Sequence, residues 1–490
     1  MQVAVKRKDI SFLPDASRVI ARFLYTTEER AKNTIHAVLK MTENEATISL
    51  NQALRDYSMR HRNISKIFEN HYNKILHIIL KLNIDPESLS HAQKIIIGSY
   101  FTMEYSIEAA AFFNPSIVEH PDQSEILPSE KRVIISFRAT GEGHISSIVF
   151  RTGVLDKNNN LTIEQVGNML EEAEHIRLHT YNKDSFRNKL DEMQHFRDLI
   201  PPGLILDKLN DTFSYSELEK CIEEAKKGLH LAADKELLFN QIIWLASSHY
   251  ELQFSLDTNI SERVIFPVSA NEKNGIEDAR FVKFTEDDGR VNYYATYTAY
   301  NGSTVLPKMI DTRDFYHFHV LPLNGEIAQN KGMALFPRKI NGQYVMLCRM
   351  DGFNNYIAFS NTINVWREAK LLQEPKFLWE LIQIGNCGSP IETPDGWLVI
   401  THGVGPMREY VISASLLDLN HPEKEIGRLK WPLIVPNSKE REGYVPNVVY
   451  SCGSIIHNED LIIPYAMSDY ASTYATVNLR ELLNELKNSR

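Results

Sequence analysis

The chain has 490 residues, 43% of them hydrophobic and 24% charged, with a formal net charge of -10 at pH 7. This length allows a large core and more than one structural unit, and the negative charge disfavours nucleic acid or an anionic membrane surface as the main partner. The four cysteines form no Cys-x-x-Cys pair, so neither a zinc site nor a disulfide framework is expected.

The first residues contain no apolar run of signal-peptide length, and no stretch approaches the length of a membrane span. A cytoplasmic protein is therefore expected. Residues 1–24 are predicted to form an N-terminal arm. Thr26 and Glu29 then have the spacing of a capping box, and apolar positions recur at helical intervals after them. This pattern predicts a helical block over about residues 25–112.

Strand patterns follow over residues 113–183. Val133–Arg138 and Ile145–Phe150 alternate like hairpin partners, and the glycine-containing turn between them lacks the strand–loop–helix context of a phosphate-binding loop. A second helical block is predicted over about residues 184–248. Residues 249–490 return to short strands separated by turn signals, a pattern typical of a sandwich, a barrel or a propeller.

A recurring unit favours the propeller. Strands that end in a polar or charged residue and lead through a turn into a second strand recur near Arg138, Thr298, Arg349, His402 and Tyr465. Each would be the inner strand of one blade, with its last residue at a central channel. We therefore expect a mainly β fold, a five-bladed β-propeller, with the two helical blocks as insertions.

The segment Asn274-Gly-Ile-Glu-Asp-Ala-Arg280 opens the larger β region. On an extended strand, Glu277 and Asp278 would point to opposite faces. Arg280 would share the face of Asp278, within reach of a carboxylate or an anionic substrate. Such strings are also common on protein surfaces, so the segment alone leaves both interpretations open.

Further stretches add to this segment. They are Phe113-Asn-Pro-Ser-Ile, Ser136-Phe-Arg-Ala, Gly275-Ile-Glu-Asp-Ala-Arg, Thr296-Tyr-Thr-Ala-Tyr, Ala334-Leu-Phe-Pro-Arg-Lys-Ile-Asn-Gly-Gln-Tyr, Asp395-Gly-Trp, Thr401-His-Gly-Val and Arg441-Glu-Gly-Tyr-Val-Pro-Asn-Val-Val. In number and order they resemble glycoside hydrolase family 130, the β-mannoside phosphorylases and β-mannosidases, over about residues 113–155 and 256–475. The resemblance implies a five-bladed β-propeller with its active site at the central channel.

The chain departs from the family pattern at three places, and these departures leave the substrate open. Ala279 stands where a proline usually follows the catalytic Asp. Cys348 stands where a histidine commonly precedes the inner-strand arginine. The usual Gly-Pro-Pro becomes Gly388-Ser-Pro390.

The resemblance assigns Asp278 as the acid that protonates the glycosidic oxygen through the 3-hydroxyl of the mannosyl residue. This role needs a carboxyl group that stays protonated near neutral pH, which burial would favour. The alternative is a structural carboxylate held by Arg280. A phosphorylase must also bind a phosphate dianion, and the matching positions are Arg138, Lys331, Arg349, His402 and Tyr410. Each cation could instead lie on the surface, and His402 could be a core histidine hydrogen-bonded at a strand end.

The remaining candidates are sugar-binding positions: Asn114, Glu277, Arg280, Tyr300 and Asp469. Trp366, Trp379 and Trp397 could stack on sugar faces, although buried packing is the more ordinary role. No metal site and no cofactor are expected, with inorganic phosphate as co-substrate. The expected partners are a β-mannoside oligosaccharide and phosphate, without nucleic acid or membrane, and a homo-oligomer is one expected assembly.

The resemblance implies an inverting β-mannoside phosphorylase that releases mannose 1-phosphate. The alternative is an inverting β-mannosidase acting on β-1,2-mannosides, in which Glu142, Glu374 or Glu380 would serve as the base at about 6.5–9.5 Å from the acid. A non-catalytic carbohydrate-binding propeller is a third possibility. The choice of linkage, β-1,2 or β-1,4, stays open.

Overall fold

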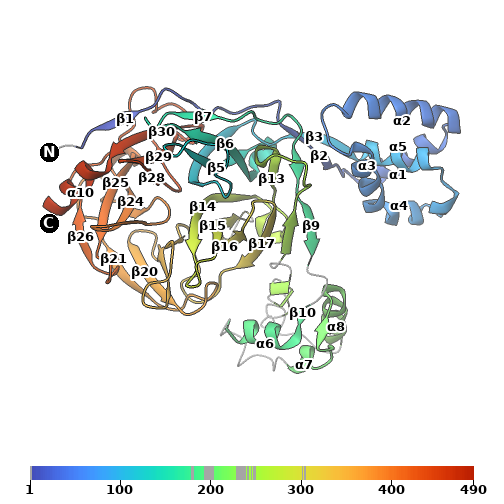
Figure 1. Cartoon of the computed structure of the whole chain (residues 1–490). Coiled ribbons are helices and arrows are strands. Elements are labelled where there is room, and N and C mark those ends of the chain that lie inside the picture. Colours follow the sequence, from blue (N-terminus) through green and yellow to red (C-terminus); the bar gives the residue numbers. More distant parts are fainter. Residues whose placement is uncertain are drawn as a thin grey trace.

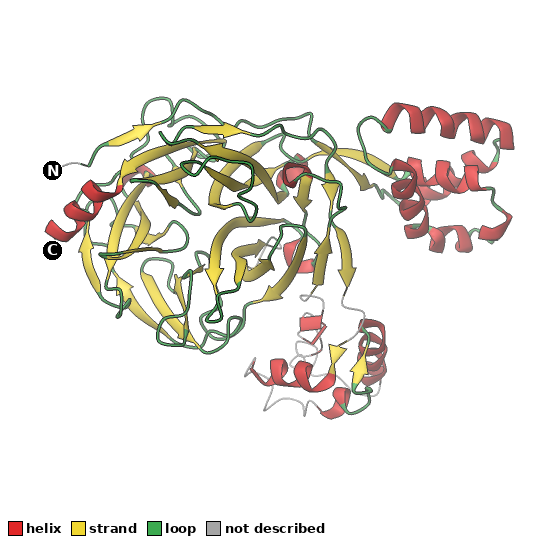
Figure 2. Cartoon of the chain, in the orientation of Figure 1, coloured by secondary structure: helices red, strands yellow, loops and turns green. Residues whose placement is uncertain are grey.

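The computed structural model describes residues 3–177, 181–192, 203–227, 239, 242–243, 245–246, 250–300, 302 and 305–489. Strands account for 38% and helices for 23%, so the predicted mainly β fold is confirmed. Figure 1 shows a rounded body of strands, with one helical segment projecting from its side and another below it. Figure 2 shows that the helices gather in these two projections, apart from short turns and the C-terminal helix.

The β body is built from antiparallel runs of strands that follow one another along the chain. The largest sheet contains two of these runs. Run one is β4 (Ala111–Glu119), β5 (Lys131–Thr140), β6 (Ser146–Leu155) and β7 (Leu161–Ile163). Run two is β14 (Gly275–Thr285), β15 (Val291–Tyr300), β16 (Val305–Thr312) and β17 (His317–Pro322). β8 (Glu171–Glu172), β9 (Glu174–Arg177), β12 (Tyr250–Gln253) and β13 (Arg263–Ile265) extend this sheet.

Three smaller sheets complete the body. Run three is β18 (Ala334–Leu335), β19 (Tyr344–Cys348), β20 (Asn355–Ser360) and β21 (Ala369–Gln373). Run four is β22 (Gln383–Asn386), β23 (Ile391–Thr393), β24 (Gly396–Val404), β25 (Tyr410–Leu417) and β26 (Glu425–Arg428). Run five is β27 (Val449–Tyr450), β28 (Ile455–His457), β29 (Asp460–Met467), β30 (Ala471–Asn478) and β1 (Val5–Arg7).

Run five joins the two ends of the chain. β1 pairs antiparallel with β30, with Lys6 opposite Thr476. Glu440 fixes this junction because it accepts from Arg7 Nε at 3.0 Å and from the Tyr465 hydroxyl at 2.7 Å. Helix α10 (Leu479–Asn488) follows β30, and its buried leucines pack into the core of the last two runs.

The recurring unit predicted from the sequence falls on one equivalent strand of each run. Arg138, Thr298 and His402 lie on β5, β15 and β24, Tyr465 lies on β29, and Arg349 directly follows β19. In every run this strand is the second along the pairing path and has partners on both sides. It is not an edge strand, because the strand that opens each run precedes it in the sheet order, and its place as the inner strand of a blade stays a prediction.

The first helical segment contains α1 (Glu28–Leu39), α2 (Glu43–Tyr57), α3 (Ile64–Lys74), α4 (Leu76–Lys81) and α5 (His91–Tyr100). Thr42 and Ser90 begin α2 and α5 with complete capping boxes. The predicted extension of this block to residue 112 was wrong. β3 (Thr102–Ser106) follows α5 and pairs with β2 (Val19–Phe23), so a two-stranded stem carries the helices. Figure 1 shows this stem leading away from the β body.

The second helical segment has a small core of its own. It contains β10 (Tyr181–Asn182), α6 (Lys183–Glu192), α7 (Gly203–Leu206), β11 (Thr212–Phe213) and α8 (Tyr215–Lys227). Phe186, Phe213 and Ile222 belong to its buried cluster. Pro201, Pro202 and most of residues 228–249 lie outside the described residues. In the described part of the chain, no helix combines the length and apolar character needed to cross a membrane.

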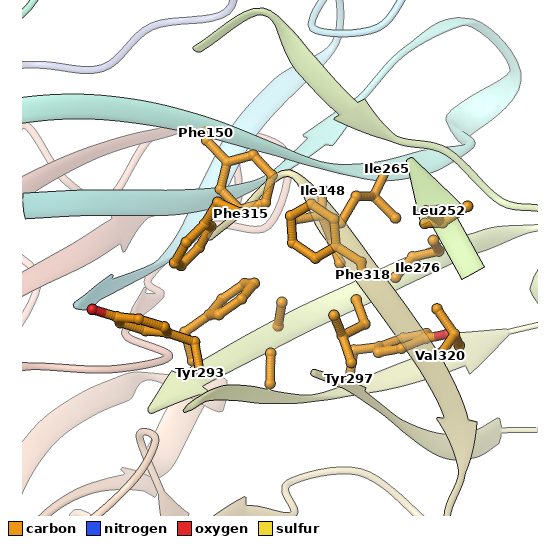
Figure 3. Close-up of a cluster of buried hydrophobic side chains, with 14 of the residues drawn as sticks. Ile148, Phe150, Leu252, Ile265, Ile276, Tyr293, Tyr297, Phe315, Phe318 and Val320 are labelled. Atoms are coloured by element: carbon orange, nitrogen blue, oxygen red, sulfur yellow. The ribbon is translucent and has the colours of Figure 1, made fainter. Parts of the chain in front are cut away.

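The core of the largest sheet anchors the segment that the sequence singled out. Figure 3 shows aromatic and aliphatic side chains gathered between β6 and the strands of run two. Phe150 packs edge-on against Phe315 with ring centroids 5.8 Å apart. Ile276 is fully buried in this cluster. Because Ile276 precedes Glu277 and Asp278, hydrophobic packing fixes the backbone from which both carboxylates project.

Candidate active site

Two β-bulges on the neighbouring strands β4 and β14 place the predicted acid. The pairing of β4 with β5 shifts register at Asn114, and that of β14 with β15 shifts at Asp278. Both residues adopt left-handed backbone conformations, with φ of 50° and 56°. Asn and Asp accept this conformation more readily than most residues with a side chain. The bulges turn the two side chains together, and Asn114 Nδ2 donates to Asp278 Oδ1 at 2.6 Å.

The bulge also brings the two acidic residues to the same cation. Arg138 Nη2 donates to Glu277 Oε1 at 2.7 Å, and Arg138 Nη1 lies 3.5 Å from Asp278 Oδ1. Lys331 Nζ donates to the other Glu277 oxygen at 2.5 Å. The expectation that Glu277 and Asp278 point to opposite faces was wrong, because strict alternation does not hold across a bulge.

Arg280 is held by residues of other runs and not by a hydrogen bond to the acid in the described structure. Its Nη1 donates to the Asn386 side-chain oxygen at 2.6 Å and to the Asn386 carbonyl at 3.1 Å, while Nη2 donates to the Tyr450 hydroxyl. The residue is 3% exposed. Arg280 therefore links runs two, four and five, and its positive charge acts to lower the pKa of Asp278, although none of its hydrogen bonds in the described structure goes to that carboxylate.

The protonation of the acid differs from the sequence expectation. Burial acts to raise the pKa of Asp278, but Arg138, Lys331 and the Asn114 amide outweigh it, and the pKa lies below its ordinary value. Asp469 shows the opposite balance. Its burial and the neighbouring Asp278 carboxylate raise its pKa to about 6. The expectation that burial alone keeps Asp278 protonated was therefore wrong, and in the unliganded protein the proton is held more readily by Asp469.

Arg349 is the basic candidate that offers a donor. Its Nε is buried and has no hydrogen-bond partner in the described structure. It packs beside Gly332, the residue after Lys331, and its charge lowers the pKa of His402. Arg138 and Lys331 are bound to carboxylates, so Arg349 differs from them in having guanidinium capacity for an incoming anion.

His402 is a core histidine, which was the alternative to a phosphate-binding role in the sequence analysis. It is 2% exposed, and its Nδ1 lies 3.1 Å from the Asn386 carbonyl while Nε2 lies 2.9 Å from the Gln383 side-chain nitrogen. Burial, with Arg349 and Arg280, lowers the pKa of His402 well below its ordinary value. The ring is therefore neutral, donating through Nδ1 and accepting at Nε2. Tyr410 stacks on it with an interplanar angle of 13°.

Other candidates lie apart from the acid. The Tyr300 hydroxyl donates to the Gly302 carbonyl in an exposed turn. Trp366 and Trp397 are fully buried, and each indole donates to a backbone carbonyl. Trp379 donates to the Lys430 carbonyl. These contacts give two of the three tryptophans packing roles in the core.

The three glutamates considered as a hydrolytic base have other surroundings. Glu142 lies exposed in the turn between β5 and β6, and Glu374 is exposed between β21 and β22. Glu380 is buried, and it accepts from Arg428 Nη1 at 3.1 Å and from two backbone amides. Within the described part of the chain, none of the hydrogen bonds of these side chains involves Asp278 or its direct partners.

Two residues of the site were missed by sequence reasoning. Asn386 and Tyr450 hold Arg280, and the Tyr450 ring also contacts His402 edge-on at 5.0 Å. Asn386 directly precedes the Cys387-Gly388 stretch, so a polar residue before a chain irregularity was an available signal. Tyr450 gave no signal, because nothing local distinguishes it from other strand tyrosines.

Comparison with known proteins identifies the family. The sequence model of glycoside hydrolase family 130, described as β-1,4-mannooligosaccharide phosphorylase, matches residues 233–488. The chain belongs to glycoside hydrolase family 130. The resemblance seen in the sequence is thereby confirmed.

Named relatives within family 130 include two phosphorylases. The chain is 35% identical over 224 residues to the 1,2-β-oligomannan phosphorylase of Thermoanaerobacter sp. (strain X514), covering 44% of this chain and 74% of the relative. It is 29% identical over 254 residues to the β-1,2-mannobiose phosphorylase of Listeria innocua serovar 6a, covering 50% of this chain and 68% of the relative. The structure of a Listeria innocua β-1,2-mannobiose phosphorylase in complex with β-1,2-mannobiose has 23% identity and a TM-score of 0.46, over 78% of this chain and 93% of that chain.

The places where this family 130 chain departs from the expected pattern are internal. Ala279 is 5% exposed beside the acid, and Cys348 is fully buried on β19. Burial raises the pKa of the Cys348 thiol to about 12, so it stays a neutral thiol. Ser389 leaves a buried hydroxyl without a partner in the described structure.

Proposed function

We propose that this protein is an inverting β-mannoside phosphorylase that cleaves β-linked manno-oligosaccharides with inorganic phosphate and releases mannose 1-phosphate. Membership of family 130 and the phosphorylase names of its relatives support this activity. The observation that carries it in the structure is the pair of partly buried cations Arg138 and Lys331 that act on Asp278, together with Arg349 beside Gly332, whose Nε has no hydrogen-bond partner in the described structure.

We also propose that the five runs are the blades of a five-bladed propeller, with the active site at one end of its channel. The sequential antiparallel runs and the pairing of β1 with β30 support this architecture. The proposed division of the chain is an arm over residues 1–24, helical insertions within 25–112 and 184–248, and propeller segments over 113–183 and 249–490.

The reaction follows from these positions. Phosphate binds against Arg349 and attacks the anomeric carbon from the face opposite the leaving sugar. The bond from this carbon to the glycosidic oxygen breaks, and the oxygen receives a proton that Asp278 supplies through the 3-hydroxyl of the mannosyl residue. Holding both reactants in one pocket lowers the entropic part of the barrier. The bound sugar is oriented by Asn114 and Asp469.

Phosphate has a second role in this proposal. In the unliganded site, the cations hold the pKa of Asp278 below its ordinary value. A phosphate dianion beside Arg349 and Arg138 offsets their positive field and raises the pKa of Asp278. Asp469, whose pKa is about 6, is the neighbouring carboxyl from which a proton can come. Substrate phosphate therefore converts Asp278 from a carboxylate into an acid.

The alternative is an inverting β-mannosidase, in which water replaces phosphate. The surroundings of Glu142, Glu374 and Glu380 give it less support than phosphorolysis. We further propose a cytoplasmic enzyme without a cofactor. Its four cysteines are free, which is compatible with a reducing compartment. We also propose that it assembles as a homo-oligomer.

The test is product analysis with β-1,2- and β-1,4-mannobiose, each with and without inorganic phosphate. Phosphorolysis requires phosphate and gives mannose 1-phosphate in the α configuration together with free mannose from the acceptor end. Release of mannose alone at an equal rate in phosphate-free buffer would establish the mannosidase. Binding of both disaccharides without turnover would favour the non-catalytic propeller.

A further inference from the structure

A cavity lies where the segments that build the active site continue. It has a volume of about 530 Å³, and we call it the rear pocket; its lining includes Ile117, Glu119, Phe281, Lys283, Ser389 and Ser454. β4 carries both Asn114 and Glu119, and β14 carries both Asp278 and Lys283. Along each strand the rear pocket begins three residues after the site residue, at Ile117 and Phe281, and reaches five residues after it, which is a separation of about 10–17 Å.

Two further segments also lead from the active site to the rear pocket. Asn386 is followed by Ser389, and Tyr450 is followed by Ser454, with the first residue of each pair at Arg280 and the second in the rear pocket. Arg280 is buried between the two ends and bonds to both Asn386 and Tyr450. A structural layer therefore separates the rear pocket from the catalytic cluster, and the two are distinct sites.

The charges of the rear pocket favour an anion. Glu119 is shared by two lysines, with Lys131 Nζ at 3.0 Å and Lys283 Nζ at 2.7 Å. Arg338 pairs with Glu392 at 2.7 Å. These five lining side chains carry three positive and two negative charges, which leaves one positive charge uncompensated in a protein of net charge -10. A shared carboxylate leaves the lysines with donor capacity for a further acceptor.

The rear pocket also includes two serine hydroxyls that have no hydrogen-bond partner in the described structure. Ser389 and Ser454 line the cavity, and their hydroxyls are enclosed and make no hydrogen bond in the described structure, so rotation about the Cα–Cβ bond can turn each toward a ligand. Ser389 stands at the position where the family pattern leads one to expect proline, which has no side-chain donor. Phe281 and Ile391 add apolar side chains to the lining of the rear pocket.

We propose that the rear pocket binds a hexose phosphate. The uncompensated positive charge and the lysine ammonium groups suit a phosphate group, the two serine hydroxyls suit sugar hydroxyls, and the apolar walls suit the C–H face of the ring. The volume is within the usual range of small-molecule sites. The inference rests on these residues and does not depend on the proposed phosphorolysis.

The test is calorimetric titration of the full chain with mannose 6-phosphate and glucose 6-phosphate, with sulfate as an anion lacking hydroxyls. Titrations are repeated in an Arg349→Met background, which removes the expected phosphate contact at the catalytic end. Hexose phosphate binding is expected to persist in this background. Lys283→Gln is expected to weaken it by about tenfold, because one charge-assisted hydrogen bond is lost.

Ser389→Ala combined with Ser454→Ala is expected to weaken hexose phosphate binding without lowering the thermal midpoint, since neither hydroxyl has a partner to lose. Lys339→Gln is the matched control, because Lys339 pairs with Asp287 and does not line the cavity. Loss of binding with Arg349→Met alone, binding of sulfate as tight as that of the sugars, or no binding at millimolar concentrations would overturn the proposal and leave a water-filled channel end only.

Discussion

Asn114 Nδ2 and Asp278 Oδ1 lie 2.6 Å apart, although the two residues are 164 positions apart in the chain. Each residue sits in a β-bulge with left-handed backbone, so two local irregularities combine to form one contact. Strain of this kind persists only where the surrounding structure fixes it, and it concentrates at functional sites.

Replacing Asp278 tests the proposed acid. Asp278→Asn keeps the size of the side chain and accepts the left-handed backbone, so the fold should be retained. Turnover of the active mannobiose is expected to fall by about 10²–10⁴-fold because proton donation is lost. Initial rates and circular dichroism measure the two effects. Asp288→Asn, in the exposed turn before β15, is the control expected to keep full activity.

Asn114 separates backbone conformation from side-chain chemistry. Asn114→Ala removes the amide and places a strained residue at φ 50°, and is expected to lower the free energy of unfolding by about 1–3 kcal/mol. Asn114→Gly relieves the strain but also lacks the amide. It should therefore be the more stable of the two while losing as much activity. Equal activity of Asn114→Gly and the wild type would show that the amide has no role in the reaction.

Arg349 is predicted to contribute more to phosphate binding than to sugar binding. Arg349→Met keeps much of the side-chain volume but removes the guanidinium group, and KM for phosphate is expected to rise by about tenfold or more. KM for the disaccharide should change much less. Steady-state kinetics with each substrate varied in turn measures this difference. Arg290→Met, which removes an exposed cation paired with Asp288, should leave both constants unchanged.

Asp469 is predicted to lower the stability of the folded protein at high pH and to contribute to the reaction. Its pKa rises from 3.8 to about 6 in the folded protein, so the folded state holds this proton more tightly than the unfolded chain. The resulting stabilisation is complete below pH 3.8 and is lost as the pH rises through 6. Above pH 6 the buried carboxylate is charged, and Asp469→Asn avoids that cost. The variant should gain up to about 3 kcal/mol relative to the wild type at pH 8.

Denaturant unfolding at pH 5 and pH 8 measures the effect on Asp469→Asn. The gain should be larger at pH 8 than at pH 5, and kcat/KM for the mannoside should fall at both. A stability difference independent of pH would contradict the raised pKa. Asp395→Asn, at an exposed ion pair with Lys487, is a control for the loss of a surface carboxylate.

Much of the β body and the acid could be predicted from the sequence because their signals are local. Period-two strands and turn residues mark the runs, and the segment around Asp278 carries the family motif. The helix predicted through Thr102–Ser106 failed because the apolar pattern of α5 runs into β3 without a glycine or proline between them. The bulge at Asp278 also lacks such a marker.

The surroundings of Arg280 and His402 could not be predicted, since their partners come from other runs. Whether Arg280 meets substrate or Tyr450 depends on a residue 170 positions away. The sequence allowed a buried role for His402. Its partners, the Asn386 carbonyl and the Gln383 side-chain amide, come together only in the folded protein. The residue type suggested a charged side chain at position 402, but burial keeps the His402 ring neutral.

The pairing of β1 with β30 has a consequence for synthesis of the protein. Arg7 and its partner Glu440 are 433 positions apart, and β30 is translated later still. Runs one to four can form while the chain is being made, because domains generally fold in order of emergence. β1, which is translated before the other strands of the body, has no strand to pair with until β30 has been made. The last sheet therefore closes only after the other four runs have emerged, and a product that stops before β30 would leave β1 and β29 each with an unpaired edge, open to pairing with another chain.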